Sequence, residues 1–138
     1  MNFFTDTEKK IYNKDLFDEK HHFSIIEKMS SRDFAVSSTQ LRNFYNQVVN
    51  HKLSIEQKIR AKLSEQKAFE IELPLIISLL PKVYYSCARK NKKVSPTDNP
   101  LYAFIKENIQ LIKDYQDFLA FCLHFECLVA YSTGKLQK

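Results

Sequence analysis

A single glycine, Gly134, stands near the end of this 138-residue chain, and that scarcity restricts the folds open to it. Sheet proteins use glycine in tight turns, so one glycine and four prolines favour long helices joined by polar connections. Hydrophobic residues make up 44% of the chain, which is enough for a packed core. Because this length is typical of one domain, we expect a single all-α domain over residues 1–138, a bundle of about five to six helices.

Apolar residues at helical spacing indicate where these helices lie. Ser37 with Gln40, and Ser54 with Gln57, fit capping boxes that begin two of them, and Asp114 is the expected N-cap of the last. The region 1–35 is the least patterned part, and prolines in 92–100 predict a loop between two halves of the domain. The expected helices span 15–29, 37–49, 54–69, 100–112 and 115–132. A further helical stretch within 70–91 is interrupted by proline, and Pro74 is expected in a first turn there.

The last expected helix is apolar nearly all round, which predicts the most buried element, with Leu128 in its core. Glu126 lies within this apolar stretch, and a buried carboxylate needs a partner. We therefore take Glu126 as a candidate for a structural ion pair with Arg89 or Arg42.

Motifs that indicate catalysis are missing from the sequence. It contains no H-E-x-x-H, no glycine-rich phosphate loop, no G-x-S-x-G and no paired carboxylates. The cysteines, Cys87, Cys122 and Cys127, are odd in number and lack C-x-x-C spacing, so we expect buried reduced thiols in a cytosolic protein. We expect no enzyme activity, no cofactor and no metal site.

Membrane insertion is not expected either. The first residues include acids and lack the hydrophobic stretch of a signal peptide. The longest apolar run, around Leu73–Leu80, is too short and too closely flanked by prolines to span a bilayer. The sequence therefore predicts a cytoplasmic protein.

Positive charge is concentrated in the middle of the chain. Residues 37–93 hold eleven Lys and Arg against four Asp and Glu, whereas the segments on either side each have a net charge of −1. This asymmetry favours a surface that faces a polyanion, although an ordinary solvated face explains it equally well. Tyr45 and Tyr85 are weak candidates for base stacking, since aromatic residues at helical spacing are more often core. The candidate RNA-binding residues are Arg42, Lys52, Lys58, Arg60, Lys62, Arg89, Lys90, Lys92 and Lys93.

Three segments resemble a known family when taken together and in order: SSTQLRNFYNQV at 37–48, LPKVYYSCARKNKK at 80–93 and DFLAFCLHFECLVAY at 117–131. They are similar to the "TSxLRxF", "YYxxAR" and "FExLVAY" elements of the small subunit of type III-A (Csm) CRISPR effector complexes. The family's shared arginines map onto Arg42 and Arg89. Cys127 replaces an alanine of the last element, and Ala88 stands where the family often has a glycine before the arginine.

This resemblance implies an all-helical, non-catalytic protein that acts in antiviral defence. Its partners would be target RNA and guide RNA, other stacked copies of itself, and the backbone and large subunits of the complex, with no membrane. Contacts would be to phosphates and sugars, and therefore independent of RNA sequence. Two alternatives remain open: the small subunit of a type III-B (Cmr) complex, which the "FExLVAY" ending disfavours, and a helical protein–protein adaptor with no RNA role.

Overall fold

The computed structural model describes residues 1–90 and 92–138, and every regular element in these ranges is helical. The expected all-α class is thus confirmed. The elements are η1 (Lys14–Phe17), α1 (Glu19–Met29), α2 (Ser38–Arg60), α3 (Glu65–Ile77), α4 (Leu79–Lys90), η2 (Pro96–Asp98), α5 (Pro100–Leu111) and α6 (Tyr115–Ser132), where η marks a short 3₁₀ turn.

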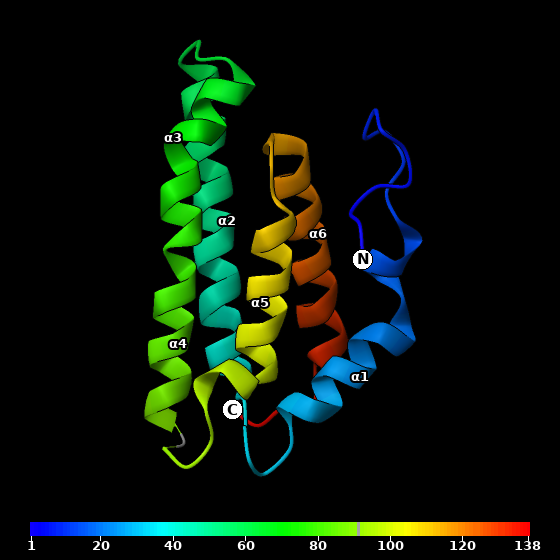
Figure 1. Cartoon of the computed structure of the whole chain (residues 1–138), viewed down its shortest axis with the longest axis vertical. Helices are drawn as coiled ribbons and strands as arrows, with labels where there is room; N and C mark the ends of the chain where they lie inside the picture. The colour runs from blue at the N-terminus through cyan, green and yellow to red at the C-terminus, as the bar shows by residue number, and fades with distance from the viewer. Residues whose placement is uncertain (91) are drawn as a thin grey trace.

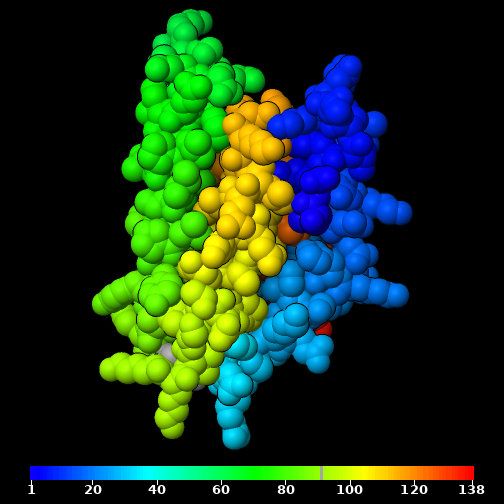
Figure 2. All heavy atoms as spheres, viewed as in Figure 1, coloured from blue at the N-terminus to red at the C-terminus, as the bar shows by residue number. Residues whose placement is uncertain are grey.

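The long helices run up and down along one direction, and α1 lies obliquely beside the lower part of α6 (Figure 1). Helix α2 is antiparallel to α3 and α4, which follow each other along its side, while α5 and α6 form a second antiparallel pair. In the space-filling view, α5 occupies the surface between the α3–α4 side and the N-terminal segment (Figure 2). The expected loop at 92–100 contains η2, and the Asn99 side chain then caps α5 by accepting a hydrogen bond from the Leu101 backbone nitrogen.

One prediction from the sequence is wrong in the region of residues 50–54, where no helix boundary exists. Helix α2 continues from Ser38 to Arg60 because its apolar stripe continues through Val48 and Ile55, both buried. Ser54 does not cap a helix, since its hydroxyl donates instead to Glu72 on α3. The next helix begins after Ser64, whose side chain accepts from the Lys67 backbone nitrogen.

Helices α3 and α4 also differ from expectation. Pro74 lies inside α3 rather than in a first turn, and the chain bends at Ser78 before α4 begins. By length and composition alone, the segment Glu65–Lys90 is apolar enough to cross a membrane, with a mean hydropathy of 1.2 over its most apolar 18 residues. This helical segment is longer than the apolar run considered above, and only 28% of that window is buried. It therefore presents apolar side chains outward as well as to the core.

Helix α6 is the centre of the core, as predicted. Asp114 caps it by accepting from the Asp117 backbone nitrogen, at the position expected from the sequence. Phe118, Phe121 and Phe125 are fully buried and pack against side chains from the other helices.

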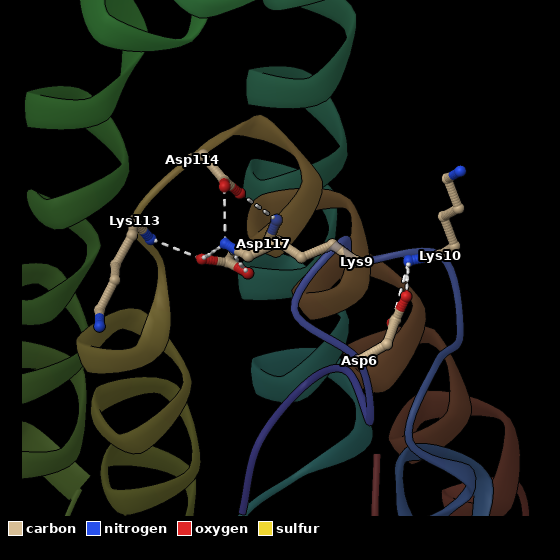
Figure 3. A network of polar contacts seen from close by, with 6 residues as sticks. All are labelled: Asp6, Lys9, Lys10, Lys113, Asp114 and Asp117. Atoms are coloured by element: carbon tan, nitrogen blue, oxygen red, sulfur yellow. Dashed lines mark hydrogen bonds and ion pairs between the residues drawn. The ribbon is translucent and has the colours of Figure 1, made fainter.

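The N-terminal segment is attached to the start of α6 by Lys9, which lies in the left-handed region with φ 58°. Its ammonium donates to the carboxylates of Asp114 at 2.6 Å and Asp117 at 3.0 Å (Figure 3). Although burial by itself lowers the pKa of Lys9, its hydrogen bonds to these two carboxylates raise the pKa overall. Phe3 is buried beside this contact, so the first residues form part of the domain.

Candidate nucleic-acid interface

A groove of about 550 Å³ runs between the first half of α2 and α4. It contains cations and amide side chains but no carboxylate, because α4 is free of acids and this part of α2 is as well. No lining side chain therefore neutralises the positive charge of the groove. The lining residues are Ser37, Thr39, Gln40, Asn43, Phe44, Gln47, Lys82, Tyr85, Ser86, Arg89 and Lys90.

The α4 side of the groove supplies the cations and one aromatic ring. Lys82, Tyr85 and Arg89 are spaced by three and four residues, which places them on one face of the helix. The guanidinium carbon of Arg89 lies 5.5 Å from the centre of the Tyr85 ring, a cation–π contact at the surface. Arg89 and Lys90 occupy the last turn of α4, where positive charge is favoured by the helix dipole. Burial lowers the pKa of the Lys90 ammonium, and the nearby Cys87 opposes this shift.

The α2 side of the groove supplies amides. Gln40 is 91% buried, and its nitrogen donates across the groove floor to the Ser86 hydroxyl on α4 at 2.9 Å. Its oxygen has no hydrogen-bond partner within the described part of the chain. Asn43 and Gln47 follow Gln40 on the same face, and their side chains make no hydrogen bonds to other described residues. These amides are available to a ligand.

A second surface on α2 lies to one side of the groove. Arg42 and Arg60 are eighteen residues apart, or five turns, so they project from one side of the helix about 27 Å apart. Asn46 and Leu53 are exposed between them on this side, and Glu56, which is half-buried, stands one turn before Arg60. Arg42 therefore does not line the groove, although the sequence grouped it with Arg89.

Two of the candidate cations are engaged within the fold. Lys58 pairs with the buried carboxylate of Glu72 at 3.2 Å and donates to the Ser54 hydroxyl at 2.8 Å. Lys52 is half-buried near the Cys122 thiol of α6, where its charge opposes the increase in thiol pKa caused by burial. Lys58 is therefore held by partners inside the fold, and Lys52 lies close enough to the core to act on a buried thiol.

The remaining candidates fall at opposite ends of the molecule. Arg60 and Lys62 lie at the α2–α3 turn, while Arg89 and Lys90 end α4 some 30 Å away, as the length of α2 requires (Figure 1). Lys92 and Lys93 are exposed in the turn that follows α4. A ligand that contacted every cluster would therefore have to extend along the whole hairpin.

The predicted burial of Glu126 is wrong, because this side chain is exposed. Gln116, Glu126 and Ala130 share a narrow stripe of α6 that faces solvent, and the helix buries its other sides. Within the described residues, Glu126 forms no ion pair with Arg42 or Arg89. The spacing of Gln116 and Glu126 was the sequence signal that could have indicated this exposed stripe.

The two tyrosines singled out from the sequence have different surroundings. Tyr45 is half-buried, with its ring 5.5 Å from that of Phe125, and burial raises its pKa. It is therefore part of the packing. Tyr85 is 56% exposed and lines the groove. Lys82 and Asn43 also line the groove and were not predicted from the sequence. The spacing of Lys82 from Arg89, seven residues or two helical turns, is the signal that could have identified Lys82.

The adjacent His21 and His22 of α1 meet His124 of α6 where the two helices pack. The Nε2 atoms of His21 and His124 are 3.2 Å apart, and His124 Nδ1 is 2.8 Å from Asn108 Oδ1. The Asn108 amide nitrogen donates to the Phe104 carbonyl, so Oδ1 is the acceptor and His124 Nδ1 carries the hydrogen. Burial lowers the pKa of His124 to about 3, and the neighbouring His22 adds to this effect. A neutral His124 therefore links α1 to α5 and α6.

The cysteines have the surroundings of core residues. Burial raises the pKa of the Cys87 thiol to about 11 and that of Cys122 to about 12, while Cys127 is half-buried. In residues 1–90 and 92–138, no group of three or more His, Cys, Asp or Glu side chains is arranged to hold a metal ion.

The fold and the groove define a small all-α bundle with one cationic, acid-free face. A family model described as Csm2 Type III-A matches residues 14–134, which is most of the chain. The chain therefore belongs to this family, the small structural subunits of type III-A Csm effector complexes, which assemble with other subunits. The match confirms the resemblance seen in the sequence and favours type III-A over type III-B. Searches of curated proteins and of solved structures found no match.

Proposed function

We propose that this protein is a non-catalytic, cytoplasmic subunit that binds the backbone of target RNA, or of the guide–target duplex, in antiviral defence. The groove between α2 and α4 and the Arg42–Arg60 stripe form the RNA-binding surface. Because these contacts reach phosphates and sugars, binding is largely independent of RNA sequence, which is read by pairing with the guide.

The observation that carries this proposal is the absence of carboxylates from the groove. Lys82, Arg89 and Lys90 lie together there, supported on helices rather than on loops. Phosphate binding needs cations at fixed positions, and an acid among them would repel the ligand. A solvated surface of ordinary composition has charges of both signs interspersed.

We further propose that several copies stack in the complex beside the backbone and large subunits. Helix α3 supports this because Ile71 and Leu75, one turn apart, are both exposed on one face, and Ile77 is exposed elsewhere on the same helix. Exposed apolar residues clustered on one helix are typical of protein–protein contacts. This face also supports the adaptor function as a second candidate, since apolar contacts alone would suffice for it.

The test is the salt dependence of RNA affinity in the full-length chain. Fluorescein-labelled RNA is titrated with wild-type protein, Lys82→Ala, Arg89→Ala and the matched control Lys28→Ala, whose exposed lysine lies on α1 away from the groove. The two groove variants should bind more weakly to every RNA, and the slope of log K against log salt should fall by about one for each cation removed. Equal slopes in all four proteins, with co-purifying protein partners and no RNA, would favour the adaptor function.

A further inference from the structure

The α2–α4 groove contains more than phosphate binding requires. Backbone recognition needs cations, yet the groove also has an aromatic ring and a row of amides along its α2 wall. Its volume of about 550 Å³ lies in the range of sites that enclose small organic groups. The groove therefore has room and hydrogen-bonding groups for a planar, polar ligand part.

Tyr85 is the planar surface in the groove. More than half of its side chain is exposed, and its neighbour Tyr84, by comparison, makes an edge contact with Tyr102 and does not line the groove. A ring held on a helix is a ready stacking surface, because it loses little freedom when a base covers it. Arg89 lies over this ring, within reach of a phosphate attached to the same nucleotide.

The amides opposite Tyr85 supply both donors and acceptors. Asn43 and Gln47 project from α2 into the groove with no hydrogen bonds to other described residues. Asparagine is a poor residue for a helix interior, and Asn43 has no hydrogen bond to another described residue that would offset this cost. Below them, the unpaired oxygen of Gln40 remains at the groove floor. The edge of a nucleobase has hydrogen-bonding groups that match amides.

We propose that the α2–α4 groove binds one unpaired nucleobase of the bound RNA, with the base stacked on Tyr85, its edge facing Asn43 and Gln47, and its phosphate on Lys82 or Arg89. This proposal rests on the proposed function and specifies its ligand as a nucleotide displaced from the stack. A continuous A-form duplex has no base free to enter the groove, so the groove distinguishes single-stranded or splayed RNA from paired RNA.

The test compares two adjacent tyrosines in the full-length chain. Affinities are measured by fluorescence anisotropy at low salt for a labelled single-stranded A₁₂ RNA and for a fully paired 12-base-pair RNA, with the wild type, Tyr85→Leu and the matched control Tyr84→Leu. Tyr85→Leu should weaken single-strand binding about tenfold and leave duplex binding unchanged, because a stacking contact is lost. Tyr84→Leu should leave both affinities unchanged. Circular dichroism confirms that each variant keeps its helix content.

A second measurement examines the groove directly. NMR titrations of the full-length chain use adenosine 5′-monophosphate and ribose 5-phosphate, which has the phosphate and sugar but no base. The nucleotide should shift the Tyr85 ring and the Asn43 side-chain amide resonances, whereas ribose 5-phosphate should shift neither. Asn43→Ala, which raises helix propensity and so preserves the fold, should weaken nucleotide binding severalfold.

The outcomes separate this proposal from the function on which it rests. If Tyr85→Leu weakens single-strand and duplex binding equally, or if both small molecules shift the same resonances, the base site is wrong while backbone binding stands. If the wild type binds neither RNA, both proposals fail. If Tyr85→Leu leaves RNA affinity unchanged but abolishes co-purification of a protein partner, the groove holds a protein side chain and the base site is again wrong.

Discussion

His51 on α2 contacts the buried carboxylate of Glu72 on α3, with 2.6 Å between His51 Nδ1 and Glu72 Oε2. The hydroxyl of Ser54 and the ammonium of Lys58 donate to the other oxygen of the same carboxylate. Burial by itself raises the pKa of Glu72, but these three partners lower it overall, so the ionised form is favoured. This polar cluster fixes how the antiparallel helices α2 and α3 pack against each other.

Replacing Glu72 with alanine should lower the free energy of unfolding by about 3–5 kcal/mol, because Lys58 and its neighbours lose their partner in a buried position. Urea unfolding measures this change. Glu70→Ala is the control, since Glu70 is exposed and, among the described residues, its side chain hydrogen-bonds only to Gln66 on its own helix. Its effect should stay within about 0.5 kcal/mol. Similar losses in the two variants would contradict a structural role that is specific to Glu72.

Lys62→Gly should stabilise the protein by about 1 kcal/mol. Lys62 has φ 78° at the end of α2, and its backbone nitrogen and that of Leu63 close the helix on Ile59 and Lys58. Glycine adopts this left-handed conformation without the steric cost that lysine bears. Thermal unfolding followed by circular dichroism measures the gain. Arg60→Gly is the matched control and should destabilise, because Arg60 is still helical. An unchanged or lower Tm for Lys62→Gly would refute this account of the turn.

Acidification should destabilise the fold through His124. Its folded-state pKa of about 3 lies below the value of about 6.5 expected for an unfolded chain, so the unfolded chain binds the proton more readily. Stability is therefore lost as the pH falls below about 6.5, and His124 should account for about 2 kcal/mol between pH 7 and pH 5. His22 acts in the same direction because burial lowers its pKa as well.

The measurement for His124 is urea unfolding of the wild type and His124→Gln at both pH values. Glutamine keeps a donor and an acceptor but does not titrate. The variant should be less stable than the wild type at pH 7, and its loss between pH 7 and pH 5 should be smaller by about 2 kcal/mol. Equal pH dependence in the two proteins would show that His124 is not the group responsible.

Leu128→Ala should cost about 2–5 kcal/mol, since Leu128 is fully buried in α6 and the substitution leaves a cavity. Leu75→Ala provides the comparison because Leu75 is 52% exposed on α3. It should change the stability of the isolated chain by less than about 1 kcal/mol. Chemical unfolding at one pH measures both. A large loss for Leu75→Ala would mean that its side chain is packed in the isolated protein.

Sequence periodicity predicted those helices whose boundaries depend on local signals. Asp114 and Pro100 mark the starts of α6 and α5 because capping and proline geometry act within one turn. Ser54 misled the prediction for the opposite reason. Its hydroxyl has a partner on α3, eighteen residues away, which competes with any local cap. No pattern within α2 reveals that partner.

The candidate RNA-binding residues also depend partly on local sequence and partly on partners from other helices. Their charge and their concentration in residues 37–93 follow from the sequence alone. Which of them is available depends on packing. Lys58 is held by Glu72, whereas Arg89 lies over Tyr85 at the groove.

The sequence by itself determined the all-α class, the most buried helix and the family. Helix periodicity, a single glycine and family-specific segments are properties of the linear chain. Only the tertiary structure decided that Lys82 and Asn43, from two different helices, line one groove, and that Glu126 faces solvent. The rotation of each helix about its axis is set by the packing of all its neighbours at once, so the face that a polar side chain occupies is a property of the whole fold.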